Sequence, residues 1–170
     1  MFSSDIIKKF SSTPTPFYYY DLELLRKTLD ALKSESEKYG YHVHYALKAN
    51  ANDEILSVIH QAGLGADCVS GNEVKKASEH KFDKIFFAGV GKSDEEINTA
   101  LDRNITCFNC ESLQEIEVIN ELSKKKSKIA QVAFRINPNV NANTHKYITT
   151  GLEENKFGIN LWELEEVVKH

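Results

Sequence analysis

The sequence is poor in the features that mark membrane, secreted and disulfide-rich proteins. No apolar run approaches the roughly 18 residues that a membrane span requires, and the start, MFSSDIIKKF, lacks the apolar segment and cleavage site of a secretory signal. The three cysteines, an odd number, do not suit a disulfide framework and fit a reducing compartment. We therefore expect a cytoplasmic protein with no membrane partner.

The sequence has no excess of basic residues either. It has 21 Lys and Arg against 25 Asp and Glu, a formal charge of −4, which argues against nucleic acid as a partner. Its one basic run, Lys124 to Lys128, follows a helical stretch, and we interpret it as a solvated helix end. With 170 residues, 41% of them hydrophobic, the chain can bury the core of a single domain.

Five segments rich in branched and aromatic residues recur along the chain and predict strands: residues 42–50, 64–70, 84–90, 105–112 and 129–138. Between them lie stretches with helical spacing, each opening on Asn or Ser, which cap helix starts well: residues 52–63, 70–80, 93–103 and 112–126. This alternation predicts an α/β fold with parallel strands, either a doubly wound sheet or a (β/α) barrel.

The two faces of the first predicted strand favour the barrel. Alternation separates two sets: Val43, Tyr45 and Leu47 on one face, and His42, His44, Ala46 and Lys48 on the other. The fifth strand separates its residues similarly, with Gln131, Ala133 and Arg135 on its more polar face. One apolar face toward helices and one polar lumen face suit a barrel better than a sheet buried alike on both faces.

The two ends of the chain do not fit the repeat. Near the start, a short aromatic strand, FYYYD, and an amphipathic helix precede the first unit, and we expect that strand to pair outside the βα series. At the other end, the chain stops at His170 after about five βα units, whereas a complete barrel takes roughly 250 residues. We therefore expect a partial (β/α)8 TIM barrel that is part of a larger protein.

Lys48 stands at the C-terminal end of the first predicted strand, on its lumen side, where barrels of this kind build their active sites. A lysine amine removed from water there loses basicity and can form a Schiff base with an aldehyde cofactor. The alternative is a rim lysine that reaches solvent. The geometry of the strand does not decide between them.

Asp67 and Arg135 are two further rim candidates. Asp67, near the end of the second strand, could hold the lysine or begin a turn. Arg135 could bind a carboxylate or a cofactor-linked acid, or pair with an acid of a neighbouring strand. After Pro138 comes a polar segment with His145, too long for an ordinary connection and on the catalytic side of a barrel, which is plausible as a substrate-facing loop.

Three other motifs have ordinary structural interpretations. Ser70 and Glu73 match the N-cap and acid of a helix capping box. The segment FFAGVGKS resembles a phosphate loop, but Phe86 stands where that loop requires glycine, so a nucleotide site is disfavoured. Cys107 and Cys110 have CxxC spacing, yet on an extended strand they lie roughly 10 Å apart on opposite faces, which predicts burial rather than a disulfide or zinc site.

Several segments, in order, resemble the N-terminal part of the diaminopimelate decarboxylases, in the alanine-racemase-like group of pyridoxal phosphate enzymes. They are HYALKAN, GLGADCVSGNE, FNCESLQEIEVI, FRINPNVNANTHKYITTG and NKFGI, within residues 14–160. The first would suggest only the wider group, whereas HKYITTGLEENKFGI after RINP points to this member. Asn72 stands where the family commonly has glycine.

The resemblance implies a (β/α)8 barrel plus a β domain built from both chain ends. It divides the chain into residues 1–35, the strand and helix associated with the β domain, and residues 36–170, an incomplete barrel domain that binds pyridoxal 5′-phosphate. It also implies that Lys48 forms the covalent link to the cofactor, that Asp67 lies beside that lysine, and that Arg135 and His145 occupy matching positions.

The activity implied is decarboxylation of meso-2,6-diaminopimelate, a small amino acid, to L-lysine and CO2, the last step of lysine biosynthesis, by a homodimer. The residues that hold the cofactor's phosphate and ring nitrogen in this family lie beyond residue 170, so we expect this chain alone to be inactive. Two alternatives stay open: a related decarboxylase of arginine, ornithine or a carboxylated polyamine, and a non-catalytic half-barrel module.

Overall fold

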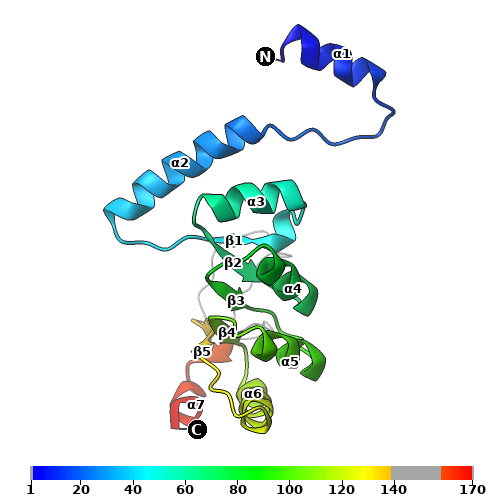
Figure 1. Ribbon diagram of the computed structural model, residues 1–170. Helices are drawn as coiled ribbons and strands as arrows, with labels where there is room; N and C mark the ends of the chain where they lie inside the picture. Colours follow the sequence, from blue (N-terminus) through cyan, green and yellow to red (C-terminus); the bar gives the residue numbers. More distant parts are fainter. Residues whose placement is uncertain (1, 139–157, 170) are drawn as a thin grey trace.

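The computed structural model describes residues 2–138 and 158–169. Its main body is a single parallel sheet covered by helices (Figure 1). The strands of this sheet are β1 (His44–Ala46), β2 (Gly65–Cys68), β3 (Ile85–Phe87), β4 (Cys107–Cys110) and β5 (Val132–Phe134). Each predicted strand segment contains one of them, so the five-strand prediction is confirmed.

The order of the strands identifies the architecture. They lie in the sheet as β1-β2-β3-β4-β5, every neighbouring pair is parallel, and the order never reverses. A doubly wound sheet reverses its strand order at a switch point, whereas a (β/α) barrel adds each strand beside the last. The described residues therefore form a partial TIM barrel of five strands, as predicted.

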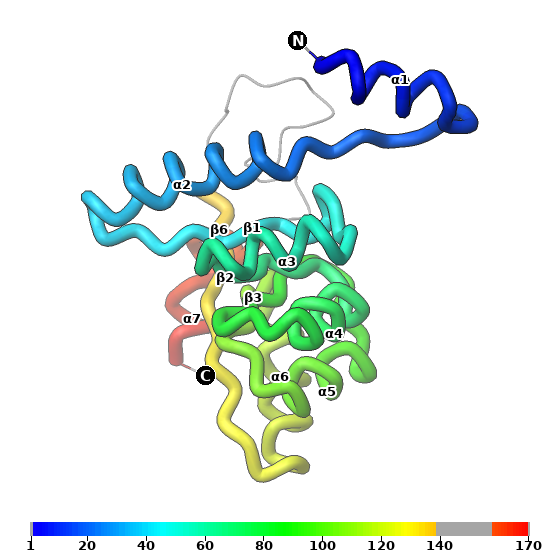
Figure 2. Tube along the Cα trace, turned by 45° about the horizontal axis from the view of Figure 1, so that its top comes forward, coloured from blue at the N-terminus to red at the C-terminus, as the bar shows by residue number. Residues whose placement is uncertain are grey.

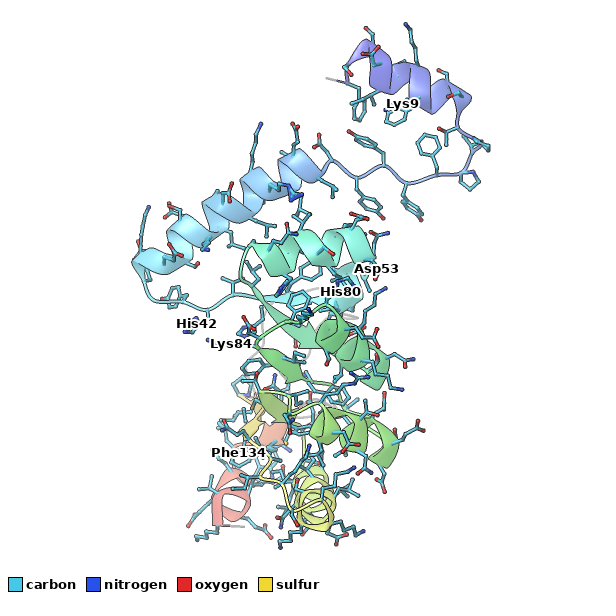
Figure 3. All side chains as sticks on the ribbon, in the orientation of Figure 1. Lys9, His42, Asp53, His80, Lys84 and Phe134 are labelled. Carbon is cyan, nitrogen blue, oxygen red and sulfur yellow. The ribbon has the colours of Figure 1, made fainter. Side chains whose placement is uncertain are left out.

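Four helices connect the strands and form one layer on the sheet (Figure 2). They are α3 (Asp53–Gln61), α4 (Gly71–Glu79), α5 (Asp94–Asp102) and α6 (Leu113–Lys125). Each starts after a side chain that caps it, because the oxygens of Asn52, Ser70, Ser93 and Ser112 accept backbone N–H groups of the first turn. Neighbouring helices are also tied by side-chain hydrogen bonds, such as the one between the Asp53 carboxylate and the His80 ring at 2.9 Å (Figure 3).

The capping box predicted at Ser70 is wrong in one detail. Ser70 accepts the N–H of Glu73, but the Glu73 carboxylate accepts the N–H of Val69 rather than that of the cap residue. The backbone N–H of Gly71 donates instead to Glu96 of α5, at 2.8 Å. Ser93 and Glu96 form a complete capping box, so Glu96 serves the starts of two helices.

The two faces of the sheet differ in burial along its central strands, whereas Val132, on the predicted apolar face of the fifth strand, is 37% exposed. Ala66, Cys68, Phe87, Phe108 and Cys110 lie on the face toward the helices and are at most 1% exposed. The opposite, concave face is less buried, with Asp67, Phe86 and Asn109 only half-buried. All three cysteines are free and buried, with Cys107 and Cys110 three residues apart within β4, as expected for structural thiols. The core lies between the sheet and its helices.

The N-terminal region differs from the prediction. A helix, α1 (Ser4–Ser12), precedes α2 (Leu22–Lys38), and α1 lies apart from the sheet (Figures 1 and 2). The aromatic run Phe17–Tyr20 pairs with no strand among the described residues. It therefore forms no strand there, because a β-strand requires hydrogen bonds to a neighbouring strand. The division after residue 35 falls inside α2 and stays a prediction.

The fifth predicted strand is divided in two at Arg135. After β5, the chain leaves the main sheet and forms β6 (Ile136–Asn137), which pairs in parallel with β7 (Ile159–Asn160). A short helix, α7 (Leu164–Lys169), follows β7. No helix in residues 2–138 or 158–169 is long and apolar enough to cross a membrane.

Candidate active site

A cavity of about 370 Å³ lies at the C-terminal ends of the parallel strands, on the concave face. It is lined by one or two residues from each of four neighbouring strand ends: Asp67, Ala88, Asn109, Glu111, Phe134 and Arg135. Two of the residues predicted from sequence, Asp67 and Arg135, therefore line the same cavity. Barrels of this type place their active sites at this end of the strands.

Lys48 lies on a turn, not on a strand. β1 ends at Ala46, and a single 3₁₀ turn, η1 (Leu47–Ala49), follows it. The Tyr45 hydroxyl donates to the carbonyl of Asn50 at 3.0 Å, which closes this turn. Burial of the Tyr45 ring also raises the pKa of its hydroxyl, so it remains a donor at neutral pH.

The prediction that strand alternation carries Lys48 to the lumen face is therefore wrong in its premise, since alternation stops two residues earlier. The position at the C-terminal rim is nevertheless as predicted. Lys48 is exposed, and its amine makes no hydrogen bond or ion pair with any residue that the structure describes. Leu47, its neighbour, is 1% exposed and anchors the turn in the core. The sequence thus presents a reachable amine on a fixed turn.

Asp67 lies across from this turn. In the parallel register of β1 and β2, Ala46 pairs with Asp67, and Asp67 pairs in turn with Phe86 of β3. The Asp67 side chain is half-buried on the concave face. The chain therefore brings a carboxylate to the strand position beside the start of the turn that carries Lys48.

Arg135 is held at both its backbone and its side chain. Its N–H donates to Cys110 of β4 at 2.9 Å, and its carbonyl accepts the N–H of Ile159 at 2.7 Å. Its guanidinium donates to both carboxylate oxygens of Glu111, at 3.0 and 3.4 Å. The Glu111 side chain is 5% exposed and that of Arg135 is 42% exposed. The ion pair with an acid of a neighbouring strand, one of the two alternatives for Arg135, is present, and the partly exposed guanidinium also borders the cavity.

The segment with His145 lies outside the described residues, so its interpretation as a substrate-facing loop stays a prediction.

Sequence reasoning missed a buried ion pair beside the cavity. Lys92, interpreted only as part of a degenerate phosphate loop, has a side chain that is 1% exposed and is paired with Glu115 of α6. Its amine also donates to the carbonyls of Gly89 and Asn109. The only sequence signal was the position of Lys92 after a strand and before a helix, which several structural roles share.

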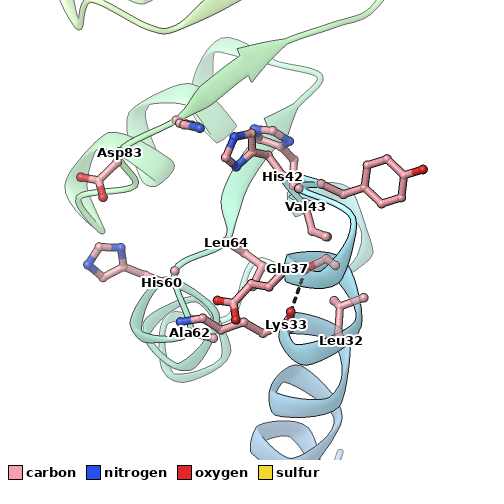
Figure 4. A pocket seen from close by; sticks show the side chains of 15 residues that line it. Leu32, Lys33, Glu37, His42, Val43, His60, Ala62, Leu64 and Asp83 are labelled. Carbon is pink, nitrogen blue, oxygen red and sulfur yellow. Dashed lines mark hydrogen bonds between the residues drawn. The ribbon is translucent and has the colours of Figure 1, made fainter.

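A second cavity, of about 360 Å³, lies at the opposite, N-terminal ends of the strands (Figure 4). Lys33, Glu37, His42, His60 and Asp83 are among the side chains around it. The His44 ring also borders it, and burial, together with the charge of Lys84, lowers the pKa of His44, so this imidazole is neutral at pH 7. This end of a barrel serves stability rather than catalysis, so the C-terminal cavity is the better candidate.

The chemistry of the C-terminal rim fits the cofactor expected from the sequence. An aldehyde needs an amine that is not already engaged in a hydrogen bond or ion pair, and Lys48 meets that condition among the described residues. A carboxylate and a guanidinium, Asp67 and Arg135, lie at the same rim to interact with the polar groups of a pyridine ring. The residues present thus fit pyridoxal phosphate.

Comparison with protein families gives a direct match. Residues 22–170 match the model described as pyridoxal-dependent decarboxylase, pyridoxal binding domain. The chain belongs to the pyridoxal-dependent decarboxylase family. The resemblance stated from the sequence is thereby confirmed, and so is its cofactor, because the matched part is the family's pyridoxal-binding domain.

Individual members of the decarboxylase family are also similar. The chain is 56% identical over 165 residues to a diaminopimelate decarboxylase of Bacteroides thetaiotaomicron, covering 95% of this chain and 43% of that protein. Its structure matches the crystal structure of diaminopimelate decarboxylase from Helicobacter pylori complexed with L-lysine, with a TM-score of 0.87 and 41% identity over 95% of this chain and 42% of the other. The crystal structure of diaminopimelate decarboxylase from M. jannaschii in co-complex with L-lysine gives a TM-score of 0.81 at 38% identity, covering 96% of this chain and 40% of the other.

The chain spans less than half the length of these relatives. What it shares with them is the family's barrel region with the C-terminal rim described above.

Proposed function

We propose that the full-length gene product that carries this chain decarboxylates meso-2,6-diaminopimelate to L-lysine and CO2, the last step of lysine biosynthesis. The observation that carries the proposal is the placement of Lys48, an exposed amine on a turn closed by Tyr45 and Asn50, beside the strand position of Asp67. An exposed amine on this turn is accessible to an aldehyde.

Pyridoxal phosphate, when bound, supplies an electron sink for the electron pair that remains on the α-carbon when CO2 leaves. The residues of this chain supply position and charge. Lys48 would provide the amine that holds the cofactor. In the net reaction, the bond from the α-carbon to the carboxylate breaks and a proton takes the place of CO2.

We assign Asp67 and Arg135 to cofactor binding and His145 to the substrate-side loop. The half-buried Asp67 carboxylate favours a positive charge near the Lys48 turn. Arg135 adds a fixed cation on the other side of the cavity, since Glu111 and two backbone hydrogen bonds hold it there. Opposite charges on the two sides of one cavity orient a ligand that carries both signs.

The choice of diaminopimelate as the substrate is supported by the names of the relatives. Proteins 56% and 42% identical to the chain are named diaminopimelate decarboxylase, and the similar Helicobacter pylori structure is described as complexed with L-lysine. The same barrel region would serve a decarboxylase of arginine, ornithine or a carboxylated polyamine, and the substrate must therefore be measured.

The test uses the purified full-length gene product, reconstituted with pyridoxal phosphate and offered meso-diaminopimelate, L-arginine, L-ornithine and carboxynorspermidine in parallel. We expect CO2 and L-lysine in equal amounts from the first and no CO2 from the other three, with no turnover by the Lys48→Ala variant. Release of CO2 only from another substrate would replace the substrate, and release from none would favour the non-catalytic module.

We also propose a homodimer in the cytoplasm. The cytoplasm is supported by the three cysteines, which are buried and free, because such thiols suit a reducing compartment. The dimer rests on the family resemblance, and light scattering of the full-length gene product should give twice the mass of one chain.

A further inference from the structure

Lys92 is the most deeply buried basic side chain with a described ion pair, and the proposed reaction does not use it. Its side chain is 1% exposed, and that of its partner Glu115 is 12% exposed. A buried charge is costly unless every hydrogen-bonding position is satisfied. Here the three N–H donors of the ammonium match three acceptors: Glu115, the Gly89 carbonyl at 2.8 Å and the Asn109 carbonyl at 2.9 Å.

These contacts join three separate parts of the rim. Gly89 lies just after β3, Asn109 lies in β4, and Glu115 lies in the first turn of α6. The amine also lies 5.4 Å from the centre of the Phe87 ring, in the core. A side chain that satisfies backbone carbonyls of two neighbouring strand ends fixes their separation. This amine has no donor left for a phosphate, so Lys92 does not act as a phosphate-loop lysine.

Glu115 extends the network toward the cavity. While one of its oxygens accepts from Lys92, the other accepts the backbone N–H of Glu111 at 2.8 Å. Glu111 in turn holds the Arg135 guanidinium through a carboxylate that is only 5% exposed. Asn109, Glu111 and Arg135 all line the C-terminal cavity. The buried pair is therefore connected to the cavity lining through the backbone of Asn109 and Glu111 and through the Glu111 side chain, which holds Arg135.

We propose that Lys92 and Glu115 are positioning residues that fix the backbone from Asn109 to Glu111 and, through Glu111, the orientation of Arg135 toward the ligand in the C-terminal cavity. The proposal rests on the proposed function, in that the ligand is pyridoxal phosphate. Replacing a buried ion pair by apolar residues often leaves stability intact. Replacing the Lys92–Glu115 pair by apolar residues would therefore remove its positioning role while leaving the fold in place.

The experiment uses the full-length gene product and the double variant Lys92→Met/Glu115→Leu. These apolar side chains have volumes similar to those of the pair and leave no unpaired buried charge. Glu115→Gln is the conservative variant, since its amide oxygen can still accept a hydrogen bond. Lys126→Met is the matched control, because Lys126 forms a comparable pair with Asp102 at 2.7 Å on the surface, far from the cavity lining.

The first measurement is hydrogen exchange of the cofactor-free protein, which needs no activity. We expect faster exchange in residues 109–111 and 135 of the double variant, unchanged exchange in α4, and no change in the Lys126→Met control. Unchanged exchange at residues 109–111 and 135 would overturn the positioning role. Faster exchange throughout the barrel would also overturn it, since that result shows a general structural role.

The second measurement is a double-mutant cycle on the dissociation constant of pyridoxal phosphate, combining the double variant with Arg135→Lys. We expect the double variant and Arg135→Lys each to weaken binding about 10-fold or more, and their combination to add little, because both disturb the same contact. Glu115→Gln, whose amide oxygen keeps one of the two acceptor positions, should lose less affinity than the double variant. Fully additive losses would overturn the positioning role and leave the proposed function intact.

A wild-type protein that binds no pyridoxal phosphate would instead contradict the proposed function. The positioning role toward this cofactor would then fail with it, while the hydrogen-exchange result would still report whether the pair braces the rim. The two failures are thus distinguished by whether the wild-type protein binds the cofactor.

Discussion

Ala46 pairs with Asp67 in the parallel register of β1 and β2, so the turn that carries Lys48 leaves the sheet beside the Asp67 carboxylate. This relationship places the strand position of Asp67 beside the turn of Lys48, 19 positions earlier in the sequence, as the family resemblance implied. Asp67 also lines the C-terminal cavity, and the first prediction follows from its position beside this turn.

Replacing Asp67 by Asn removes the negative charge beside the Lys48 turn and keeps the size of the side chain. We expect the affinity for pyridoxal phosphate to fall about 10-fold, the loss expected for one charge-assisted hydrogen bond. Titration of the visible absorbance of the bound cofactor measures it. Asp102→Asn, which changes an exposed carboxylate paired with Lys126, is the control. Equal affinities for the Asp67 variant and the wild-type protein would contradict the assignment.

Replacing Tyr45 by Phe removes the hydroxyl that closes the Lys48 turn through Asn50. We expect a loss of about 1 kcal/mol in the free energy of unfolding, because one hydrogen bond is lost, and slower covalent attachment of the cofactor to Lys48. Urea denaturation and the rate of the absorbance change measure the two effects. The same change at Tyr18, which is 88% exposed, should alter neither. A Tyr45 variant that attaches the cofactor at the wild-type rate would show that the turn needs no such closure.

Gly65 allows the His44 ring to lie against the backbone of β2. A Cβ atom at this position would stand 2.2 Å from Cδ2 and 2.7 Å from Nε2 of His44, and 3.0 Å from the Lys84 carbonyl. We expect Gly65→Ala to destabilise the protein by about 1–3 kcal/mol, the usual effect of overpacking.

Gly91→Ala is the matched control, because a Cβ at Gly91 meets nothing within 4 Å. Thermal unfolding of both variants tests the prediction. A Gly65→Ala protein as stable as the Gly91→Ala protein would mean that His44 does not occupy this place.

The lowered pKa of the Glu96 carboxyl leads us to expect a specific pH dependence of the free energy of unfolding. The backbone N–H of Gly71, and next that of Ser93, hold the pKa of the Glu96 carboxyl below its ordinary value of 4.5. A carboxyl with a lowered pKa in the folded state stabilises the protein fully above its ordinary pKa, and that contribution is lost as the pH falls through the lowered value.

The wild-type protein should therefore be more stable than the Glu96→Gln variant at pH 7, by about 1–2 kcal/mol for hydrogen bonds to a charged group. This difference should shrink below pH 4.5. Denaturation curves from pH 3 to 7 measure it, with Glu95→Gln, an exposed neighbour, as the control. A difference that is constant over this range would show that the charge of Glu96 is not involved.

Local features of the sequence were sufficient for the barrel. Strand segments follow from runs of branched and aromatic residues, and the helix starts follow from caps such as Asn52 and Ser112, whose hydrogen bonds span two or three residues. Strand parity in the first segment assigned Tyr45 and Leu47 to the apolar face, and both pack in the core. All of these depend on contacts between near neighbours in the sequence or on the pleat of a strand.

Features that depend on distant contacts were not predictable. Lys92 meets Asn109 and Glu115, which lie 17 and 23 residues away, so its burial has no local signal. The turn Leu47–Ala49 replaces three residues of the expected strand, and the Tyr45 hydroxyl donates to the Asn50 carbonyl across it. The run Phe17–Tyr20 has the composition of a strand, but a strand forms only where another strand is placed to pair with it.

The central claim is that Lys48 holds pyridoxal phosphate covalently, and borohydride reduction followed by peptide mass spectrometry tests it most directly. The full-length gene product is incubated with the cofactor, reduced and digested, and the Lys48→Ala variant is treated in the same way. The account predicts one phosphopyridoxyl group per chain, on the peptide with Lys48, and none at that position in the variant. A wild-type protein labelled at other lysines and not at Lys48 would contradict it.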